Sequence, residues 1–199
     1  MPVTSPVKLR PARRADASSM AILVDIAGYG LPAWLWGGAV RRGEAASALE
    51  VGRSRALRDD GAFSWRNAVI AELAGEVAGM LIGYREPDEP EAVDADGLDP
   101  VLRPLFELEA LAPATWYINV LATFPEFRGR GVGAALIGKA ADIARRSRAR
   151  GLSLIVEDDN AGARRLYERV GFCETARRPF HAFPGSQPAE AWILMERAI

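Results

Sequence analysis

PEFRGRGVGAALIGK, residues 125–139, decides how this chain is interpreted, because its four glycines and two arginines separate two segments of different character. WYINVLATF, residues 116–124, is rich in aromatic and β-branched residues and predicts a strand. From Val132 onward, apolar residues recur at helical spacing, namely Val132, Leu136, Ala140 and Ile143. The stretch is therefore predicted to form a strand, a glycine-rich turn and a helix.

A turn of this kind favours an anion. The first N–H groups of a helix have no partner within the helix, and the helix dipole places partial positive charge at the same end. Glycines let the backbone approach a ligand and adopt positive φ, and Arg128 and Arg130 can add charged hydrogen bonds. Phosphate is the anion that this combination predicts.

Three phosphate motifs compete for these residues. The Walker pattern G-x-x-x-x-G-K-[ST] lacks its final hydroxyl, because Ala140 stands at that position. The dinucleotide fingerprint G-x-G-x-x-G lacks its third glycine, because Leu136 stands there. The pattern R-x-x-G-x-G is matched in full by Arg128, Gly131 and Gly133.

The sequence resembles the GNAT superfamily of acetyl-CoA-dependent N-acyltransferases at two linked motifs. FRGRGVGAAL, residues 127–136, matches the coenzyme A loop of the family, [RQ]-x-x-G-x-[GA]. NAGARRLYERVGF, residues 160–172, matches the family signature N-x-x-A-x-x-L-Y-x-x-x-G-F without a gap. The resemblance is clear over residues 116–175 and extends to a hairpin predicted at 66–84. Elsewhere it rests on the order of the elements.

The resemblance implies an α/β (α+β) fold with a mixed, mostly antiparallel central sheet that is splayed near its centre and flanked by helices. The length and the 49% hydrophobic content predict a single domain over residues 1–199. Local patterns predict strands at 7–10, 116–124, 152–158 and 191–198, helices at 15–27, 42–58 and 161–170, and the hairpin. Residues 86–115 are predicted to be an acidic loop or insertion, because 86–100 hold seven acids and three prolines.

Composition argues against several classes of partner. The formal net charge of -1 supplies no general field that would attract nucleic acid, and four arginines near the end of the glycine-turn helix, Arg145, Arg146, Arg148 and Arg150, suit the helix dipole instead. No apolar stretch is long enough to predict a signal peptide or a membrane span. We therefore expect neither nucleic acid nor membrane as a partner.

The single cysteine and the single histidine predict little chemistry. Cys173 excludes an internal disulfide framework, fits a reducing, cytoplasmic compartment, and is expected to be a small buried apolar residue. His181 has no companion cysteine or histidine at metal-ligand spacing, so no metal site is expected.

The resemblance implies acetyl-CoA as the cofactor. Its pyrophosphate would lie on the backbone N–H groups of the glycine loop, and its pantetheine arm would pair with residues 121–123 like an extra strand. An N–H near Leu121 or Ala122 would face the thioester oxygen. Asn160 would bind the pantetheine arm, although an asparagine there also fits a cap on the helix that follows. The implied cofactor-binding residues are Leu121, Ala122, Thr123, Arg128, Gly129, Arg130, Gly131, Val132, Gly133, Ala134, Asn160, Ala163 and Tyr167.

Tyr167 matches the usual general acid of the family. A phenol stays protonated at neutral pH and can donate to a departing thiolate, whereas the alternative role for this residue is aromatic packing. The general base is less defined. The family often has a glutamate on the strand at 116–124, but here Tyr117 and Asn119 occupy the substrate-facing positions. Glu109, with Glu107 near it in the sequence, is the nearest upstream carboxylate and therefore the candidate base. Alternatively, these carboxylates are solvated surface charges, and a relay of water molecules accepts the proton.

The acceptor is expected to be the primary amine of a small molecule or a peptide, bound by residues 26–60 and 86–115. Tyr117, Asn119, Tyr29 and Trp34 are the candidate substrate-binding residues, and the last two also fit a core or a subunit interface. A homodimer through the C-terminal strands is an open alternative. So are a non-catalytic acyl-CoA-binding or protein-interaction module, and transfer of another acyl group or transfer to oxygen.

Overall fold

The computed structural model describes residues 6–90 and 97–199, and these form two compact units. The first unit contains residues 6–83 and Val120–Gly138, and the second contains Tyr84–Asn119, without 91–96, and Lys139–Ile199. The described strands are β1 (Lys8–Pro11), β2 (Ala68–Leu73), β3 (Glu76–Arg85), β4 (Trp116–Thr123), β5 (Gly151–Glu157), β6 (Cys173–Pro179) and β7 (Ala191–Ala198). The described α-helices are α1 (Ala17–Ala27), α2 (Leu31–Arg41), α3 (Ala48–Ala56), α4 (Arg103–Glu109), α5 (Val132–Arg146) and α6 (Ala161–Arg169).

The strands form a mixed sheet in the order β1-β2-β3-β4-β5-β7-β6. Its pairs β1–β2, β2–β3, β5–β7 and β6–β7 are antiparallel, and β4 pairs with β5 in parallel. The predicted mixed, mostly antiparallel sheet is therefore confirmed. The parallel ladder pairs Trp116–Ile118 with Leu152–Leu154, and the predicted splay of the sheet stays a prediction.

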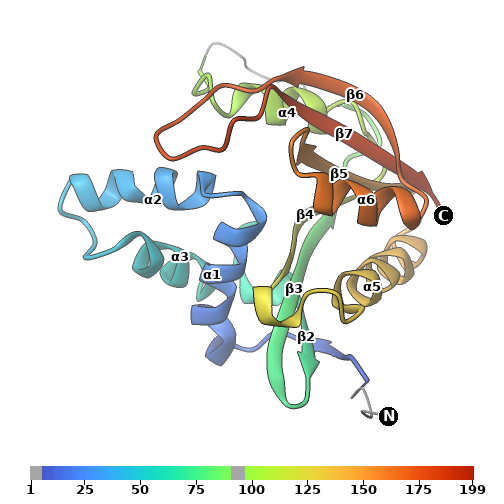
Figure 1. Cartoon of the computed structure of the whole chain (residues 1–199), viewed down its shortest axis with the longest axis horizontal. Coiled ribbons are helices and arrows are strands. Elements are labelled where there is room, and N and C mark those ends of the chain that lie inside the picture. Colours follow the sequence, from blue (N-terminus) through green and yellow to red (C-terminus); the bar gives the residue numbers. More distant parts are fainter. Residues whose placement is uncertain (1–5, 91–96) are drawn as a thin grey trace. The chain divides into compact units, whose positions relative to one another are not determined.

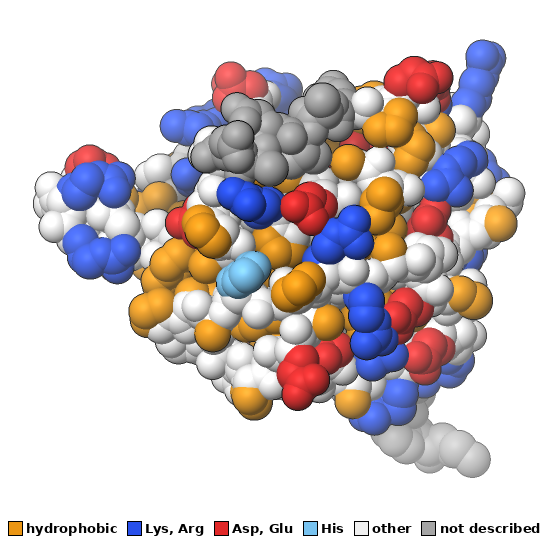
Figure 2. Space-filling model, turned by 90° about the horizontal axis from the view of Figure 1, so that it is seen from above, with side chains coloured by type: hydrophobic (Ala, Val, Ile, Leu, Met, Phe, Trp, Pro, Cys, Tyr) orange, Lys and Arg blue, Asp and Glu red, His pale blue; other side chains and the backbone are white. Residues whose placement is uncertain are grey.

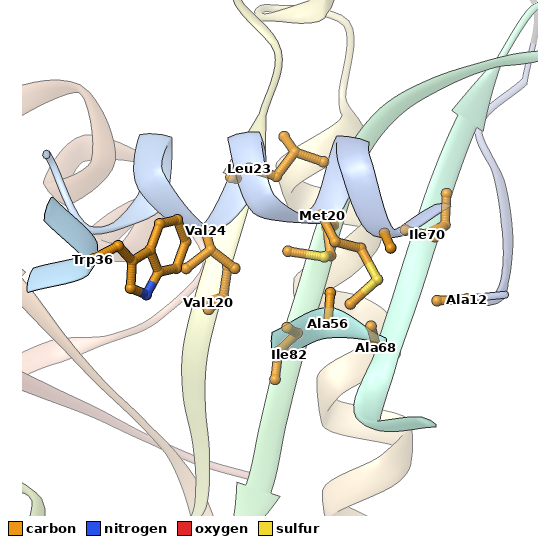
Figure 3. Packing of buried hydrophobic residues seen from close by; sticks show 13 residues of the cluster. Ala12, Met20, Leu23, Val24, Trp36, Ala56, Ala68, Ile70, Ile82 and Val120 are labelled. Atoms are coloured by element: carbon orange, nitrogen blue, oxygen red, sulfur yellow. The ribbon is translucent and has the colours of Figure 1, made fainter. Parts of the chain in front are cut away.

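The first unit is built around the predicted hairpin and the predicted first helix. Ala74 and Gly75 turn β2 into β3 with φ of 54° and 89°, the left-handed conformation that two-residue hairpin turns require. Apolar residues of α1, α2 and α3 pack on these strands (Figure 3). In that view Val24 of α1 points toward Val120 of β4. Trp36 of α2 is buried in the same cluster, so this tryptophan belongs to the core.

The second unit contains β5, β6 and β7, with α4 in contact with all three strands (Figure 1). β5 is buried along most of its length, as its continuous apolar run predicts. β6 is the edge strand, and the sequence analysis missed it. Its residues CETARRP are mostly exposed, so they carry no apolar pattern that would predict a strand. Cys173 is exposed on β6, and the expectation that it is buried is wrong.

Three helices differ from the expectations. α2 was not predicted, because Gly37 and Gly38 weaken its pattern; Pro32 stands in its first turn, where a proline is tolerated. α3 begins only at Ala48, after Ser47, whose hydroxyl accepts the N–H of Glu50 at 3.2 Å. The predicted start at residue 42 is therefore too early. The segment 86–115, predicted as a loop or insertion, contains α4, and its residues 91–96 lie outside the described residues.

The surface seen in Figure 2 mixes the two signs of charge, with Lys and Arg interspersed among Asp and Glu. The only histidine, His181, is exposed there. Within the described residues no single helix is long and apolar enough to cross a membrane, although the segments Arg14–Ala27 and Leu31–Arg41, bent by 117°, satisfy the length and composition test as a pair.

Candidate active site

The glycine loop belongs to the first unit and connects β4 to α5. A short 3-10 turn, Pro125–Phe127, follows β4, and Phe127 is buried beneath the loop. Gly129 and Gly131 have φ of 73° and 82°, so both positions favour glycine. The guanidinium of Arg130 lies 5.6 Å from the centre of the Phe127 ring. Arg128 and Arg130 are both exposed, which leaves their charges available to a ligand.

The backbone of this loop is prepared for an anion. Among the described residues, none of the six consecutive N–H groups from Gly129 to Ala134 has a hydrogen-bond acceptor, and the N–H of Ala135 is the next donor, bonded to Gly131 O at 3.0 Å. These donors lie at the positive end of the α5 dipole. The loop therefore presents a row of donors, as a phosphate site requires.

The last part of β4, Leu121–Thr123, approaches β3 very closely. A Cβ atom added to Gly79 of β3 would lie 2.5 Å from the carbonyl oxygen of Ala122 and 2.9 Å from a methyl group of Val132. Only glycine permits this approach, which fixes the start of the loop against β3 within the first unit. Arg128 Nε donates to the carbonyl of Thr123 over 3.5 Å.

The second unit holds a cluster of phenols and carboxylic acids. Tyr84 Oη donates to Glu109 Oε1 over 2.6 Å, and the rings of Tyr84 and Tyr117 are 5.6 Å apart. Burial raises the pKa of Tyr84, and the nearby charge of Glu109 raises it further. Glu109 is thus held by a phenol and is not the solvated surface charge that the sequence left open.

Tyr117 and Tyr167 share two properties in this cluster. Their side chains are 6% and 8% exposed, so both phenols are buried. Burial raises the pKa of Tyr167, and the charge of Glu157 adds to this effect. Burial likewise raises the pKa of Tyr117 well above its ordinary value. Both phenols therefore stay protonated at neutral pH and are able to donate a proton or a hydrogen bond.

Asn160 and Ala163 are joined by the helix cap that the sequence predicted. Asn160 Oδ1 accepts the backbone N–H of Ala163 at 3.2 Å, at the start of α6. The side chain of Asn160 also acts on Glu157, because it lowers the pKa of that carboxyl group.

Glu157 is the residue that the sequence analysis missed. It ends β5, is 3% exposed, and lies within the electrostatic influence of Tyr117 and Tyr167. Burial raises the pKa of Glu157 to about 7, although hydrogen bonds from its own N–H and from Asn160 oppose this shift. The feature of the sequence that could have identified Glu157 is a single acid directly after the apolar run LSLIV, at the end of a predicted buried strand.

The other predicted residues are described within the unit to which each belongs. Tyr29 follows α1, has φ of 55° and is 36% exposed, so it is not a core residue. Trp34 is half-buried on α2 in the first unit, and Asn119 is half-buried on β4. Glu107 of α4 accepts a 2.9 Å hydrogen bond from Arg178 of β6. Within residues 6–90 and 97–199, no three His, Cys, Asp or Glu side chains are grouped to hold a metal ion.

Comparison with known families gives a direct match. The model of the acetyltransferase (GNAT) family matches residues 39–172, which include the glycine loop, β5 and α6. The chain belongs to the GNAT acetyltransferase family. The matched family is one of acetyltransferases, and acetyl-CoA is the cofactor of that family.

Curated GNAT relatives match over limited segments. Mycothiol acetyltransferase of Beutenbergia cavernae is 41% identical over 71 residues, which is 36% of this chain and 24% of that protein. N-alpha-acetyltransferase 30 of Schizosaccharomyces pombe is 38% identical over 61 residues, which is 31% of this chain and 41% of that protein. The matches thus span less than half of either relative.

Solved structures confirm the GNAT fold over nearly the whole chain. A crystal structure described as an acetyltransferase has a TM-score of 0.65 at 24% identity, over 96% of this chain and 99% of that one. YncA of Salmonella typhimurium, described as a putative acetyltransferase with its cofactor acetyl-CoA, has a TM-score of 0.60 at 17% identity, over 96% and 93%. At these identities the comparison speaks for the fold alone.

Proposed function

We propose that this chain is an N-acetyltransferase that moves an acetyl group from acetyl-CoA to a primary amine by direct attack. The observation that carries the proposal is the row of six N–H groups without acceptors, from Gly129 to Ala134, at the start of α5. They suit the pyrophosphate of coenzyme A, and the exposed side chains of Arg128 and Arg130 add charge. Leu121–Thr123 would hold the pantetheine arm through their backbone.

Tyr167 supports catalysis rather than binding alone. Its side chain is 8% exposed, and burial raises its pKa and keeps the hydroxyl protonated. A thiolate has an ordinary pKa of about 8.5, so a protonated phenol can supply its proton as the carbon–sulfur bond breaks. In this proposal Tyr167 is the general acid, and Asn160 positions the cofactor while it caps α6.

The acceptor is proposed to be an amine because the cluster around Tyr117 is acidic. Glu109 and Glu157 both act electrostatically on Tyr117, and an ammonium group is favoured beside carboxylates. The family relatives named above include one acetyltransferase that is named for mycothiol and one that is named for α-amino groups. Both a small molecule and a peptide therefore belong in the first screen, and Tyr117 and Asn119 are the proposed substrate contacts.

A steady-state assay tests this function. Purified protein is mixed with acetyl-CoA and with spermidine, lysine, butylamine or a hexapeptide with a free N-terminus, and released thiol is measured. We expect release of CoA that depends on one of these amines. Binding of acetyl-CoA without release of CoA above background would instead identify a sensor or an interaction module.

A further inference from the structure

One face of the sheet in the second unit carries the acid–base groups. Tyr117 of β4 is the register partner of Ser153, and Glu157 follows Ser153 by four residues, so all three side chains lie on one face. Glu157 is also directly opposite Trp192 of β7, and opposed residues of antiparallel strands share a face. The strand register thus places Glu157 on the same face as the predicted substrate contact Tyr117, and the charge of Glu157 acts on Tyr117.

Helix α4 covers this same face. Arg178 of β6 is opposite Trp192, and its guanidinium donates to Glu107 of α4. α4 also contributes Glu109, which is held by Tyr84. This cover explains why an acidic side chain at the end of β5 is 3% exposed. The two nearby acids differ, because the carboxylate of Glu109 accepts the hydrogen bond from Tyr84.

A second observation marks this face as a place for a polar group. Trp192 is 4% exposed, and its indole N–H has no hydrogen-bond partner among the described residues. A buried donor without a partner indicates a water or a ligand atom, because the alternative costs about 1–3 kcal/mol. The donor belongs to the residue directly opposite Glu157.

We propose that Glu157 is the carboxylate that accepts the proton of the acceptor ammonium group. The proposal rests on the proposed N-acetyltransferase function. The carboxylate takes one proton and leaves a neutral amine, whose nitrogen then forms the amide bond as the carbon–sulfur bond breaks. Tyr167 donates its proton to the thiolate and regains one from the amide nitrogen. Glu157 afterwards releases its proton to solvent, so one proton appears for each acetyl group transferred.

The charges around Glu157 suit this task. The titratable groups that act on it or respond to it are Asp158, Asp159, Tyr117 and Tyr167. The two aspartates favour its protonated form, and the Asn160 amide favours the carboxylate. A pKa of about 7 lets Glu157 be ionised before the reaction and take up a proton during it.

The test is the pH profile of kcat/KM for Glu157→Gln, measured with the most active alkylamine of the panel. An alkylamine loses its own proton near pH 10. A rise in kcat/KM centred near pH 7, the acidic limb of the profile, therefore reports a group of the enzyme. We expect the wild type to show this limb and Glu157→Gln to lose it, with kcat about 100-fold lower at pH 7.5 and a smaller deficit at pH 9.5, where solvent supplies the neutral amine. The dissociation constant of acetyl-CoA should stay within about two-fold of the wild-type value, because the variant loses a group that acts in the chemical step.

Two controls separate the role of Glu157 from a general effect of lost charge. Glu168→Gln removes an exposed carboxylate beside Tyr167 and should behave as the wild type. Glu109→Gln removes the competing acid and should retain the limb near pH 7. Loss of the limb in Glu109→Gln, or its persistence in Glu157→Gln, would overturn the proposal.

The outcomes distinguish this inference from the proposed function. A wild type that transfers no acetyl group to any amine would refute the function, and the role of Glu157 with it. An active wild type whose profile survives Glu157→Gln would refute the role of Glu157 alone. If Glu157→Gln does not fold, Glu157→Asp and the wild type decide, because both must show a limb between pH 6 and 8, and its absence from either would contradict the proposal.

Discussion

The hydroxyl of Tyr84 donates a 2.6 Å hydrogen bond to Oε1 of Glu109, which joins β3 to the end of α4 in the second unit. The centre of the Tyr84 ring also lies 5.6 Å from the centre of the Tyr117 ring. Glu109 was the carboxylate that the sequence favoured as general base. In the structure this carboxylate accepts a hydrogen bond from a phenol, and its role as a base stays a prediction.

Tyr84→Phe should therefore destabilise the protein without abolishing acetyl-CoA binding. A hydrogen bond to a carboxylate contributes about 1.5–3 kcal/mol, and the partial exposure of Glu109 reduces this to about 1–2 kcal/mol. Urea unfolding measures the loss, with Tyr29→Phe as the matched control at an exposed tyrosine. A loss for Tyr84→Phe no larger than the control would show that the bond contributes nothing measurable.

Gly131→Ala should weaken acetyl-CoA binding at least ten-fold. Its φ of 82° is strained for alanine by about 1–2 kcal/mol, although no atom lies within 4 Å of the added Cβ, so the effect comes from the backbone and not from a clash. The matched control is Gly138→Ala, inside α5 and equally open, which should keep the affinity and stabilise the helix by about 0.5–1 kcal/mol. Calorimetric titration compares the two, and equal affinities would remove the loop from the binding site.

Tyr167→Phe should lower kcat about 100-fold and leave the dissociation constant of acetyl-CoA within about three-fold, because the variant keeps the ring and loses only the proton. The ring contact with Phe172, 5.9 Å between centroids, remains. An unchanged kcat would mean that Tyr167 is a packing residue.

Glu157 should also make the free energy of unfolding depend on pH. Its pKa is raised from 4.5 to about 7 in the folded state, so the folded protein binds more protons between these values. The free energy of unfolding should therefore fall as pH rises from about 4.5 to 7, by up to about 3 kcal/mol at 1.4 kcal/mol for each pH unit. The difference between wild type and Glu157→Gln, measured by urea unfolding at pH 5, 6, 7 and 8, isolates this term. A difference that does not change with pH would contradict the burial of an ionisable group at this position.

Asp16 should show the opposite sign in the first unit. The guanidinium of Arg10 donates to both of its carboxylate oxygens, at 2.8 and 2.9 Å, and this hydrogen bonding lowers the pKa of Asp16. Its stabilising effect is present above the ordinary pKa near 4 and is lost as pH falls through the lower folded value. Asp16→Asn should cost about 2–3 kcal/mol at pH 7 and less at pH 3. A cost that is equal at both pH values would show that charge plays no part.

The sequence predicted the elements whose periodicity or motif is strong. The glycine loop, the buried strand β5 and helix α6 occur where LSLIVED and the N-x-x-A-x-x-L-Y signature place them. The sequence did not predict β6, because this exposed edge strand has no apolar alternation. It also did not predict α2, the helix that buries Trp36, because the glycines of this segment weaken its helical pattern. These elements are defined by their neighbours and not by local propensity.

The candidate site divides in the same way. The loop N–H groups and Tyr167 follow from motifs, so they could be predicted from the sequence. Glu157 could not, because a single acid at the end of a strand is usually solvated, and its burial depends on α4 and on the register with β7. The preference for Glu109 arose from distance along the chain, which does not reveal that Tyr84 already occupies this carboxylate.

Transfer itself is tested most directly with acetyl-CoA that carries an isotopic label in the acetyl group. We would incubate the protein with the labelled donor and the amine panel. The amine products are then separated and quantified by mass spectrometry. The account predicts labelled N-acetyl amine and free CoA in equal amounts, both lowered at least about ten-fold in Gly131→Ala at low acetyl-CoA. Free CoA without labelled amine, or no release at all, would contradict the assignment as an N-acetyltransferase.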